Sequence, residues 1–179
     1  MQRGIAMAAE PRFDTINGVS LKVLGETIDA IKKDPGLGRC KFRARNKWMG
    51  GTKNGTTVTG FYGARAEQKH ALAFHMLADE PPILSGGDEA ANPVEHLLHA
   101  LASCVTTSLV AHAAVKGIHI EELESELEGD LDLNGFLGLD PGVPKGYTNI
   151  RMKFKVTTDA ENLKLLRRLS EFSPVYNTL

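Results

Sequence analysis

Cysteine is scarce in this chain, and its scarcity excludes two kinds of small stabilised domain. Cys40 and Cys104 are the two cysteines among 179 residues, and they form no C-x-x-C pair. A disulfide framework and a structural zinc ribbon both need more cysteines at closer spacing. The sequence therefore fits a reducing compartment, and we expect a cytoplasmic protein.

A charge excess and targeting segments are also missing. Lysine and arginine number 21 and aspartate and glutamate 22, for a net charge of −1. Domains that bind nucleic acid usually carry a basic excess, so no such partner is expected. Residues 1–12 lack the apolar core of a signal peptide and are interpreted as a loose leader before a single domain over 13–179. Histidines and hydroxyl residues interrupt the apolar stretch 97–115, which predicts a buried helix rather than a membrane span.

Motifs that bind nucleotides or carry a serine nucleophile are absent too. The sequence contains no GxGxxG that follows a strand, no GxxxxGK[ST] and no GxSxG. The glycines of 135–146 are interpreted as turn residues. His96 and His99 lie three residues apart, but the sequence indicates no further ligands, so hydrogen-bonded helix residues are favoured over a metal site. We predict neither a metal nor a cofactor.

Apolar periodicity predicts elements of both kinds in the first half of the chain. Apolar residues at steps of three and four predict a helix over 17–34, which the following Asp-Pro-Gly ends. Alternation then predicts a three-strand meander over 39–78 with a basic outer face, and Asn54-Gly55 is the expected hairpin signal. A loop rich in proline, glycine and acidic residues follows over 79–92.

A long central helix is predicted over 92–116. Asn92, Pro93 and Glu95 form the start signal of a helix, with a capping residue, a first-turn proline and an acid at the third position. Gly117 is the expected stop. Because the helix itself carries small and apolar residues on nearly all of its faces, we expect it to be buried in the middle of the structure.

Two stretches of opposite charge predict a pair of strands over 120–157. Residues 120–132 alternate leucine with glutamate and aspartate, and residues 148–157 alternate apolar residues with arginine and lysine. Opposite charges on neighbouring strands stabilise pairing by roughly 0.2–1 kcal/mol each. A helix is predicted over 159–172. Strands grouped between helices indicate an α+β fold rather than a parallel doubly wound sheet.

Cys104 lies more than two turns into the central helix, and its residue type leaves two interpretations open. Most free cysteines in such a position are small core residues. The alternative is a redox nucleophile, which requires a thiolate and therefore a nearby cation, because burial raises the pKa of a thiol.

Several segments in order resemble the OsmC/Ohr family of osmotically inducible and organic-hydroperoxide-resistance proteins. The first is Asn92-Pro-Val-Glu-His-Leu-Leu-His-Ala-Leu-Ala-Ser-Cys104, which resembles the cysteine helix of that family. The later segments are Gly129-Asp-Leu-Asp132, Gly135-Phe-Leu-Gly138, Gly146-Tyr-Thr-Asn-Ile150 and Ser173-Pro-Val175. The resemblance covers about residues 17–179 and is closest to an OsmC-like subgroup with an extra N-terminal helix.

The resemblance implies a fold and a chemistry. It implies an intertwined homodimer in which antiparallel sheets from both chains wrap two long central helices. It also implies a thiol-dependent peroxidase, in which a cysteine thiolate attacks an organic hydroperoxide and an external dithiol resets the enzyme. By the same resemblance, Cys104 stands at the reactive cysteine.

The remaining site residues depart from the family pattern. Ser173 stands at the resolving cysteine and cannot form a disulfide. The activating glutamate usually follows the proline directly, where this chain has Val94, so Glu95, one residue further on, is the expected substitute. Lys53 is the nearest cation by sequence to the place of the family arginine. The family usually continues with a strand after Ser173-Pro-Val, so the sequence is expected to stop short of it.

These residues lead to two main hypotheses. The first is a peroxidase in oxidative stress defence that works with one cysteine: Cys104 is the nucleophile, Glu95 and Lys53 are activators, and Ser173 lines the site. An external thiol, or Cys40, resolves the sulfenic acid. The second is a catalytically degenerate dimer that binds a small apolar ligand at the subunit interface. A structural protein with charged strand faces is a third, without specific support.

Overall fold

The computed structural model describes residues 14–159, 161 and 163–179, so the expected leader over 1–12 lies outside the described residues. The chain is α+β with antiparallel sheets, as predicted. The helices are α1 (Leu21–Lys33), α2 (Pro93–Val115), α3 (Leu133–Phe136) and α4 (Leu163–Ser170), with 3-10 turns η1 (Pro35–Gly38) and η2 (Pro82–Leu84). The strands are β1 (Thr15–Ile16), β2 (Val19–Ser20), β3 (Lys41–Phe42), β4 (Arg45–Gly50), β5 (Lys53–Gly63), β6 (Ala66–Ala78), β7 (Ile120–Asp130) and β8 (Asn149–Thr158).

The N-terminal helix begins later than the apolar periodicity predicts. Its expected first turn is instead the small hairpin β1–β2, whose two turn residues are Asn17 and Gly18. Both have positive φ, at 53° and 76°, which is the backbone of the turn that Asn-Gly favours. Ser20 then caps α1 by accepting a hydrogen bond from the amide of Val23. The expectation of a helix from residue 17 was therefore wrong over its first four positions.

The meander over 39–78 was predicted with three strands but has four, because residues 43–44 divide its expected first strand into β3 and β4. We call this antiparallel sheet of β3 to β6 the open sheet. Strand β5 is central and pairs with β3 and β4 at one edge and with β6 at the other. Asn54-Gly55, expected as a turn, lies inside β5, and the chain reverses at Gly51 and Thr52. Gly50 and Gly51 both have positive φ, so the two glycines make the turn possible.

The central helix α2 begins and ends as predicted. The side chain of Asn92 accepts from the amide of Glu95, and the carboxylate of Glu95 accepts from the amide of Asn92. Beyond its end, Gly117 has a φ of +73°. Among the described residues α2 alone is long and apolar enough to cross a membrane, which is weak evidence because the core helix of a soluble protein passes the same test.

The acidic and basic strands pair as predicted. Strands β7 and β8 form an antiparallel hairpin that places Glu124 opposite Lys155, Glu126 opposite Lys153 and Glu128 opposite Arg151. The Arg151 guanidinium also donates to both carboxylate oxygens of Asp130, at 2.5 and 2.9 Å. The hydrogen bond to Asp130 is the main cause that raises the pKa of Arg151. Alternate apolar side chains face α2 from the other side of this hairpin.

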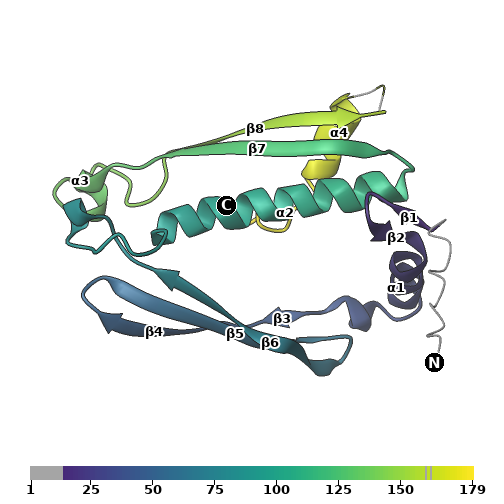
Figure 1. Cartoon of the computed structure of the whole chain (residues 1–179), viewed down its shortest axis with the longest axis horizontal. Helices are drawn as coiled ribbons and strands as arrows, with labels where there is room; N and C mark the ends of the chain where they lie inside the picture. Colours follow the sequence, from purple (N-terminus) through teal and green to yellow (C-terminus); the bar gives the residue numbers. More distant parts are fainter. Residues whose placement is uncertain (1–13, 160, 162) are drawn as a thin grey trace, which may run out of the picture.

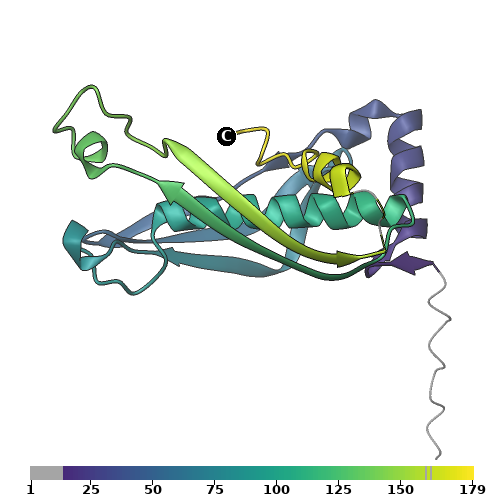
Figure 2. The same cartoon turned by 90° about the horizontal axis from the view of Figure 1, so that it is seen from above.

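We call α2, β7, β8 and α4 together the packed layer, because the core of the described chain lies within it. Its buried cluster consists of Leu109, Ala113, Leu166 and Leu169. Apolar side chains from the hairpin and α4 pack against that cluster: Ile118, Ile120, Leu123, Val156 and Leu165. The hairpin crosses over α2 when the molecule is seen from above (Figure 2). The predicted C-terminal helix over 159–172 is the shorter α4, and residues 160 and 162 lie outside the described part.

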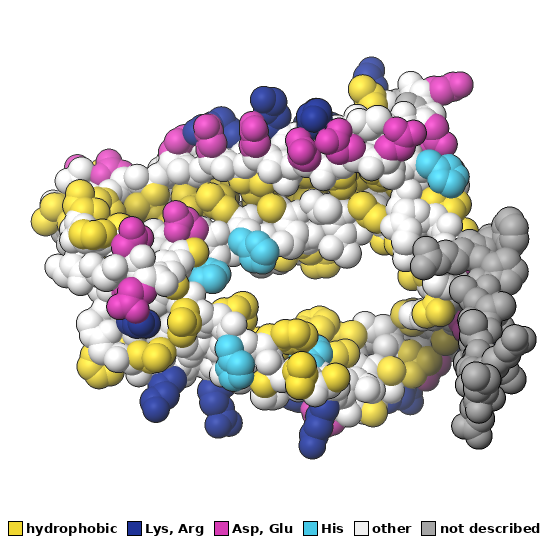
Figure 3. Space-filling view, in the orientation of Figure 1, with side chains coloured by type: hydrophobic (Ala, Val, Ile, Leu, Met, Phe, Trp, Pro, Cys, Tyr) yellow, Lys and Arg dark blue, Asp and Glu magenta, His cyan; other side chains and the backbone are white. Residues whose placement is uncertain are grey.

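The open sheet lies on the other side of α2 from the hairpin β7–β8 (Figure 1), and a hollow separates it from α2 in the space-filling view (Figure 3). Hydrophobic side chains line both walls of this hollow, and basic side chains project from the far side of the sheet (Figure 3). The side chains of Leu72, Trp48 and Phe74 are 79 %, 70 % and 55 % exposed. The open sheet thus carries an apolar surface that the described part of the chain does not cover.

Candidate functional site

Cys104 lies in the middle of α2 and is partly buried. Helical residues three and four positions apart lie on one face, so Cys104 shares a face with Leu97 and Leu101. In the described part of the chain, no hydrogen bond or ion pair joins Cys104 to another side chain. The sulfur atom is therefore held by packing alone within one chain.

A cavity of about 620 Å³ opens beside this face of α2. Leu97 and Leu101 form one wall, and the start of β8 and the C-terminal residues form the other. The remaining lining residues are Tyr147, Thr148, Asn149, Ile150, Met152, Tyr176 and Leu179. Because the lining holds aliphatic groups, hydroxyls and an amide but no charged side chain, the cavity suits a neutral and largely apolar molecule.

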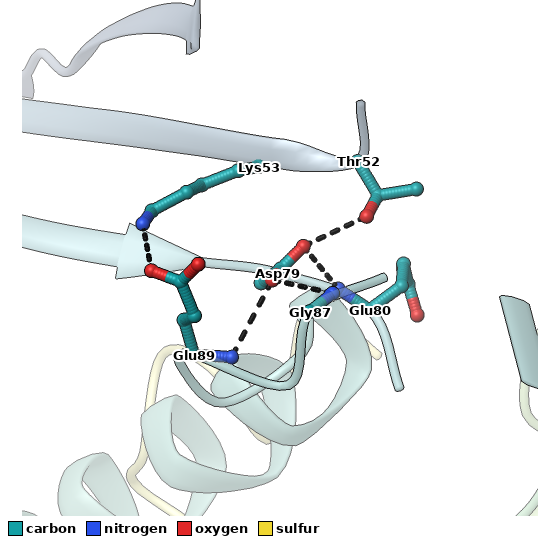
Figure 4. A network of polar contacts seen from close by, with 6 residues as sticks. All are labelled: Thr52, Lys53, Asp79, Glu80, Gly87 and Glu89. Carbon is teal, nitrogen blue, oxygen red and sulfur yellow. Dashed lines mark hydrogen bonds and ion pairs between the residues drawn. The ribbon is translucent and has the colours of Figure 1, made fainter. Parts of the chain in front are cut away.

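Lys53, the expected activating cation, is the first residue of β5 and forms an ion pair with the carboxylate of Glu89 (Figure 4). Glu89 belongs to the loop that leads from β6 to α2. The positive charge of Lys53 is therefore compensated locally, and no described contact joins it to Cys104.

Glu95, the expected activating acid, forms the capping box with Asn92. It precedes Cys104 by nine residues, which is about 13 Å along a helix axis. That separation is too great for its carboxylate to touch the sulfur of the same chain. The alternative in which Glu95 caps the helix is therefore observed.

Ser173, at the place of the resolving cysteine, is fully buried. Its hydroxyl accepts a hydrogen bond from the amide of Tyr176 at 3.2 Å, and its carbonyl accepts from the side-chain amide of Asn177 at 2.7 Å. These contacts organise a C-terminal turn. Cys104, Glu95, Lys53 and Ser173 are thus not brought into direct contact by hydrogen bonds or ion pairs within the described chain.

The two histidines that were considered as metal ligands, His96 and His99, have ordinary hydrogen-bond partners. The Nε2 atom of His96 lies 2.8 Å from the carbonyl oxygen of Leu77, and Nδ1 of His99 lies 3.5 Å from the hydroxyl of Ser103. Within residues 14–159, 161 and 163–179, no group of three or more metal-ligating side chains gathers.

Tyr147 joins the start of α2 to the hairpin β7–β8. Its hydroxyl donates to the carbonyl oxygen of Val94 at 3.0 Å, and its ring packs against Gly129, where an added Cβ would lie 2.3 Å from a ring carbon. Burial, together with the nearby charge of Glu95, raises the pKa of Tyr147. The phenol therefore stays neutral and keeps its proton for the hydrogen bond.

Asp79 is a polar residue that the sequence reasoning missed. It follows β6 directly, is 3 % exposed, and accepts hydrogen bonds with both carboxylate oxygens. The donors are the hydroxyl of Thr52 at 2.7 Å and the backbone amides of Glu80 at 2.9 Å, Gly87 at 3.0 Å and Glu89 at 3.4 Å (Figure 4). The sequence signal was the run of acid, proline and glycine over 79–92, but the run alone does not reveal which acid is buried.

Comparison with known proteins identifies the family. Residues 86–179, more than half of the chain, match the family model described as OsmC-like protein. The chain belongs to the OsmC family. No curated protein matches the chain by sequence.

Solved structures of this family share the fold at low sequence identity. An OsmC-like protein from Mycoplasma pneumoniae is 16 % identical, with a TM-score of 0.56 over 77 % of this chain and 86 % of that one. An OsmC-like protein of unknown function from Vibrio cholerae O1 biovar eltor is 14 % identical, with a TM-score of 0.56 over 78 % of this chain and 93 % of that one. Both likenesses concern the fold alone.

Proposed function

We propose that this OsmC-family protein is a thiol-dependent peroxidase that reduces organic hydroperoxides through Cys104. The observation that carries the proposal is the place of Cys104: it stands at the reactive cysteine of the family motif and on the helix face that lines an uncharged cavity. An apolar hydroperoxide in this cavity would lie along Leu101, about one helical turn from Cys104, and Leu97, about two turns from it.

The proposed reaction divides into oxidation and reduction of one sulfur atom. The Cys104 thiolate attacks the terminal oxygen of the hydroperoxide, the O–O bond breaks, and the alkoxide leaves and takes up a proton to become the alcohol. Cys104 becomes a sulfenic acid. An external thiol then attacks the sulfenic sulfur and releases water, and a second thiol group of the same dithiol frees Cys104 and closes its own disulfide.

The two residues of this chain that were candidates to resolve the sulfenic acid favour resolution from outside the chain. Ser173 has no sulfur and its hydroxyl is occupied in a turn. Cys40 lies in the other layer, next to Gly63 of the open sheet. Neither residue is a convenient resolving group for Cys104, which is why the proposal includes a dithiol reductant.

We further propose that the protein acts as a homodimer. The support is the apolar surface of the open sheet, which includes Trp48, Leu72 and Phe74 and borders a cavity of about 680 Å³. Soluble monomers rarely expose contiguous apolar patches larger than a few hundred Å². A second copy inserted between sheet and helix would cover both walls of the hollow.

One observation favours a second candidate function. A buried thiol needs a cation to become a thiolate, and Lys53 is paired with Glu89 while Glu95 is occupied as a helix cap. A dimer that binds a neutral apolar ligand beside α2, with Cys104 as a packing residue, needs no such cation.

Turnover separates the two functions. Purified protein is mixed with cumene hydroperoxide and dihydrolipoamide, and consumption of the peroxide is followed for wild type, Cys104→Ser and Cys40→Ser. We expect turnover that Cys104→Ser abolishes and Cys40→Ser retains. Equal, slow consumption by wild type and Cys104→Ser, from protein shown to be folded, would reject the peroxidase and leave the ligand-binding dimer.

A further inference from the structure

We propose that Asp79 is a positioning residue that sets the separation between the open sheet and helix α2. The proposal goes beyond the peroxidase reaction and does not depend on it. It concerns the geometry that places Cys104 relative to the opposite wall of the hollow.

The first step of the argument is that few contacts within one chain join the two layers at this end. Apart from the loop, the Nε2 atom of His96 in α2 lies 2.8 Å from the carbonyl oxygen of Leu77 in β6. Over most of its length the sheet does not pack against α2, as the exposure of Leu72 and Trp48 shows. The layers meet where β6 runs into the loop 79–92 and the loop runs into α2. Contacts in this loop therefore control the angle between them.

The second step is that Asp79 ties this loop to the sheet. Its Oδ1 atom accepts from the Thr52 hydroxyl in the β4–β5 turn and from the amide of Glu80. Its Oδ2 atom accepts from the amides of Gly87 and Glu89, on the far side of the loop. One carboxylate thus links the strand turn to the residues that precede α2 (Figure 4).

The third step is that the loop is too tightly packed to adopt many arrangements. A Cβ atom added at Gly86 would lie 1.6 Å from the carbonyl oxygen of Glu80, so only glycine fits there. Ser85 and Asp88 have φ values of 62° and 55°, in the left-handed region. Two further contacts lie next to this loop: the ion pair between Lys53 and Glu89, and the contact of His96 with the Leu77 carbonyl.

At the opposite end of the hollow, Asn17 provides a separate attachment. Its side-chain amide donates to the carbonyl of Ile118 at 3.0 Å, and its side-chain oxygen accepts from the amide of Ile120 at 2.9 Å. Loss of the Asp79 link should therefore loosen one end of the hollow more than the other.

Asp79→Asn is a sharp test because an amide has a single acceptor oxygen. The side-chain oxygen of this variant can accept the hydrogen bonds on the Thr52 side or those on the Gly87 side. Its NH2 group then faces backbone N–H donors on the opposite side, where no hydrogen bond can form. Asp88→Asn is the matched control: it removes the same charge from the same loop at an exposed residue outside the network.

The measurement is the distance distribution between two spin labels by pulsed electron paramagnetic resonance. Labels at Lys47 and Ser103 report the Asp79 end, and labels at Lys69 and Lys116 report the other end. All four positions are exposed. The background carries Cys40→Ser and Cys104→Ser, and labelled protein is diluted with unlabelled protein so that only distances within one subunit are seen.

We expect Asp79→Asn to broaden the Lys47–Ser103 distribution at least twofold and the Lys69–Lys116 distribution less, with Asp88→Asn unchanged. A folded Asp79→Asn with the wild-type distribution would overturn the proposal. Should Asp79→Asn fail to fold, Thr52→Val decides, because it removes one donor: broadening at the same end supports the proposal, and an unchanged distribution overturns it. Neither outcome depends on peroxidase activity.

Discussion

The two layers of this protein place their apolar side chains differently. In the packed layer, Leu109 and Leu169 are 3 % and 2 % exposed and meet side chains of the same chain. In the open sheet, Leu72 and Trp48 are 79 % and 70 % exposed. Burial of these two side chains would be as favourable in free energy as burial of the leucines in the packed layer. The difference teaches that sequence hydrophobicity marks a surface to be covered but does not say which chain covers it.

Truncation of one leucine in each layer should give the largest contrast. Leu109→Ala removes buried methyl groups and leaves a cavity, and we expect it to lower the free energy of unfolding by about 2–5 kcal/mol. Leu72→Ala removes an exposed group, and in dilute monomer we expect a change below about 0.5 kcal/mol. Urea unfolding of both variants at low protein concentration measures the contrast. Equal losses would mean that the sheet is covered within one chain.

A charge placed on the open sheet should act on association rather than on folding. Phe74 is 55 % exposed on the surface that the proposed partner would cover. If it is an interface anchor worth about 2 kcal/mol, Phe74→Asp weakens dimerisation about 30-fold. Sedimentation velocity over a range of concentrations gives the dissociation constant. Lys41→Asp is the control, because Lys41 is an exposed residue of the same sheet that does not line the cavity beside the proposed interface. Equal dissociation constants for wild type and Phe74→Asp would contradict the proposed interface.

Acid should loosen the link between the layers and leave the packed layer intact. The hydrogen bond from Thr52, together with those from the amides of Glu80, Glu89 and Gly87, lowers the pKa of Asp79. A lowered pKa in the folded state means that the Asp79 contribution is complete above the ordinary value of about 3.9 and is lost as pH falls through the lower folded value. The other charged groups that adjoin the site are Lys53 and Glu89, which form an ion pair with each other.

Amide hydrogen exchange as a function of pH measures this effect. After correction for the intrinsic exchange rate, protection of the amides of Gly87 and Glu89 should be constant from pH 7 to about 3.9 and fall at lower pH. Protection of Leu109 and Ala113 in α2 should fall only when the whole chain unfolds. Loss of protection at Gly87 near neutral pH would show that the carboxylate is not what holds the loop.

Local signals made most of the fold predictable from sequence. Asn92, Pro93 and Glu95 act within one helical turn, and the alternation of Glu and Lys on β7 and β8 acts between neighbouring strands, so both predictions were confirmed. Two of the three Asn-Gly pairs in the sequence show the limit of such signals. Asn17-Gly18 forms a turn, whereas Asn54-Gly55 lies in a strand because the turn glycines at 50–51 already reverse the chain.

The site was less predictable because its contacts join residues distant in sequence. Cys104 could be found from the motif around it. The pairing of Lys53 with Glu89 spans 36 residues and the bond of Thr52 to Asp79 spans 27, and no periodic pattern encodes either contact. Such polar contacts depend on where loops end in space, which single-sequence patterns do not specify.

The smallest effect should come from the charged outer face of the packed layer. Arg151 contacts Glu128 and Asp130 across β7 and β8, but its side chain is half exposed, so solvent screens these ion pairs. We expect Arg151→Ala to lower the thermal midpoint in low salt by several-fold less than Leu109→Ala does, and most of the difference to vanish in 1 M NaCl because salt screens exposed charges. Arg45→Ala in the open sheet is the comparison, since no ion pair of Arg45 is among the described contacts, and it should change the midpoint little at either salt concentration. A loss for Arg151→Ala that persists in high salt would instead assign its effect to packing of the arginine stem along the hairpin, and would place part of the stability of this layer on its outer face.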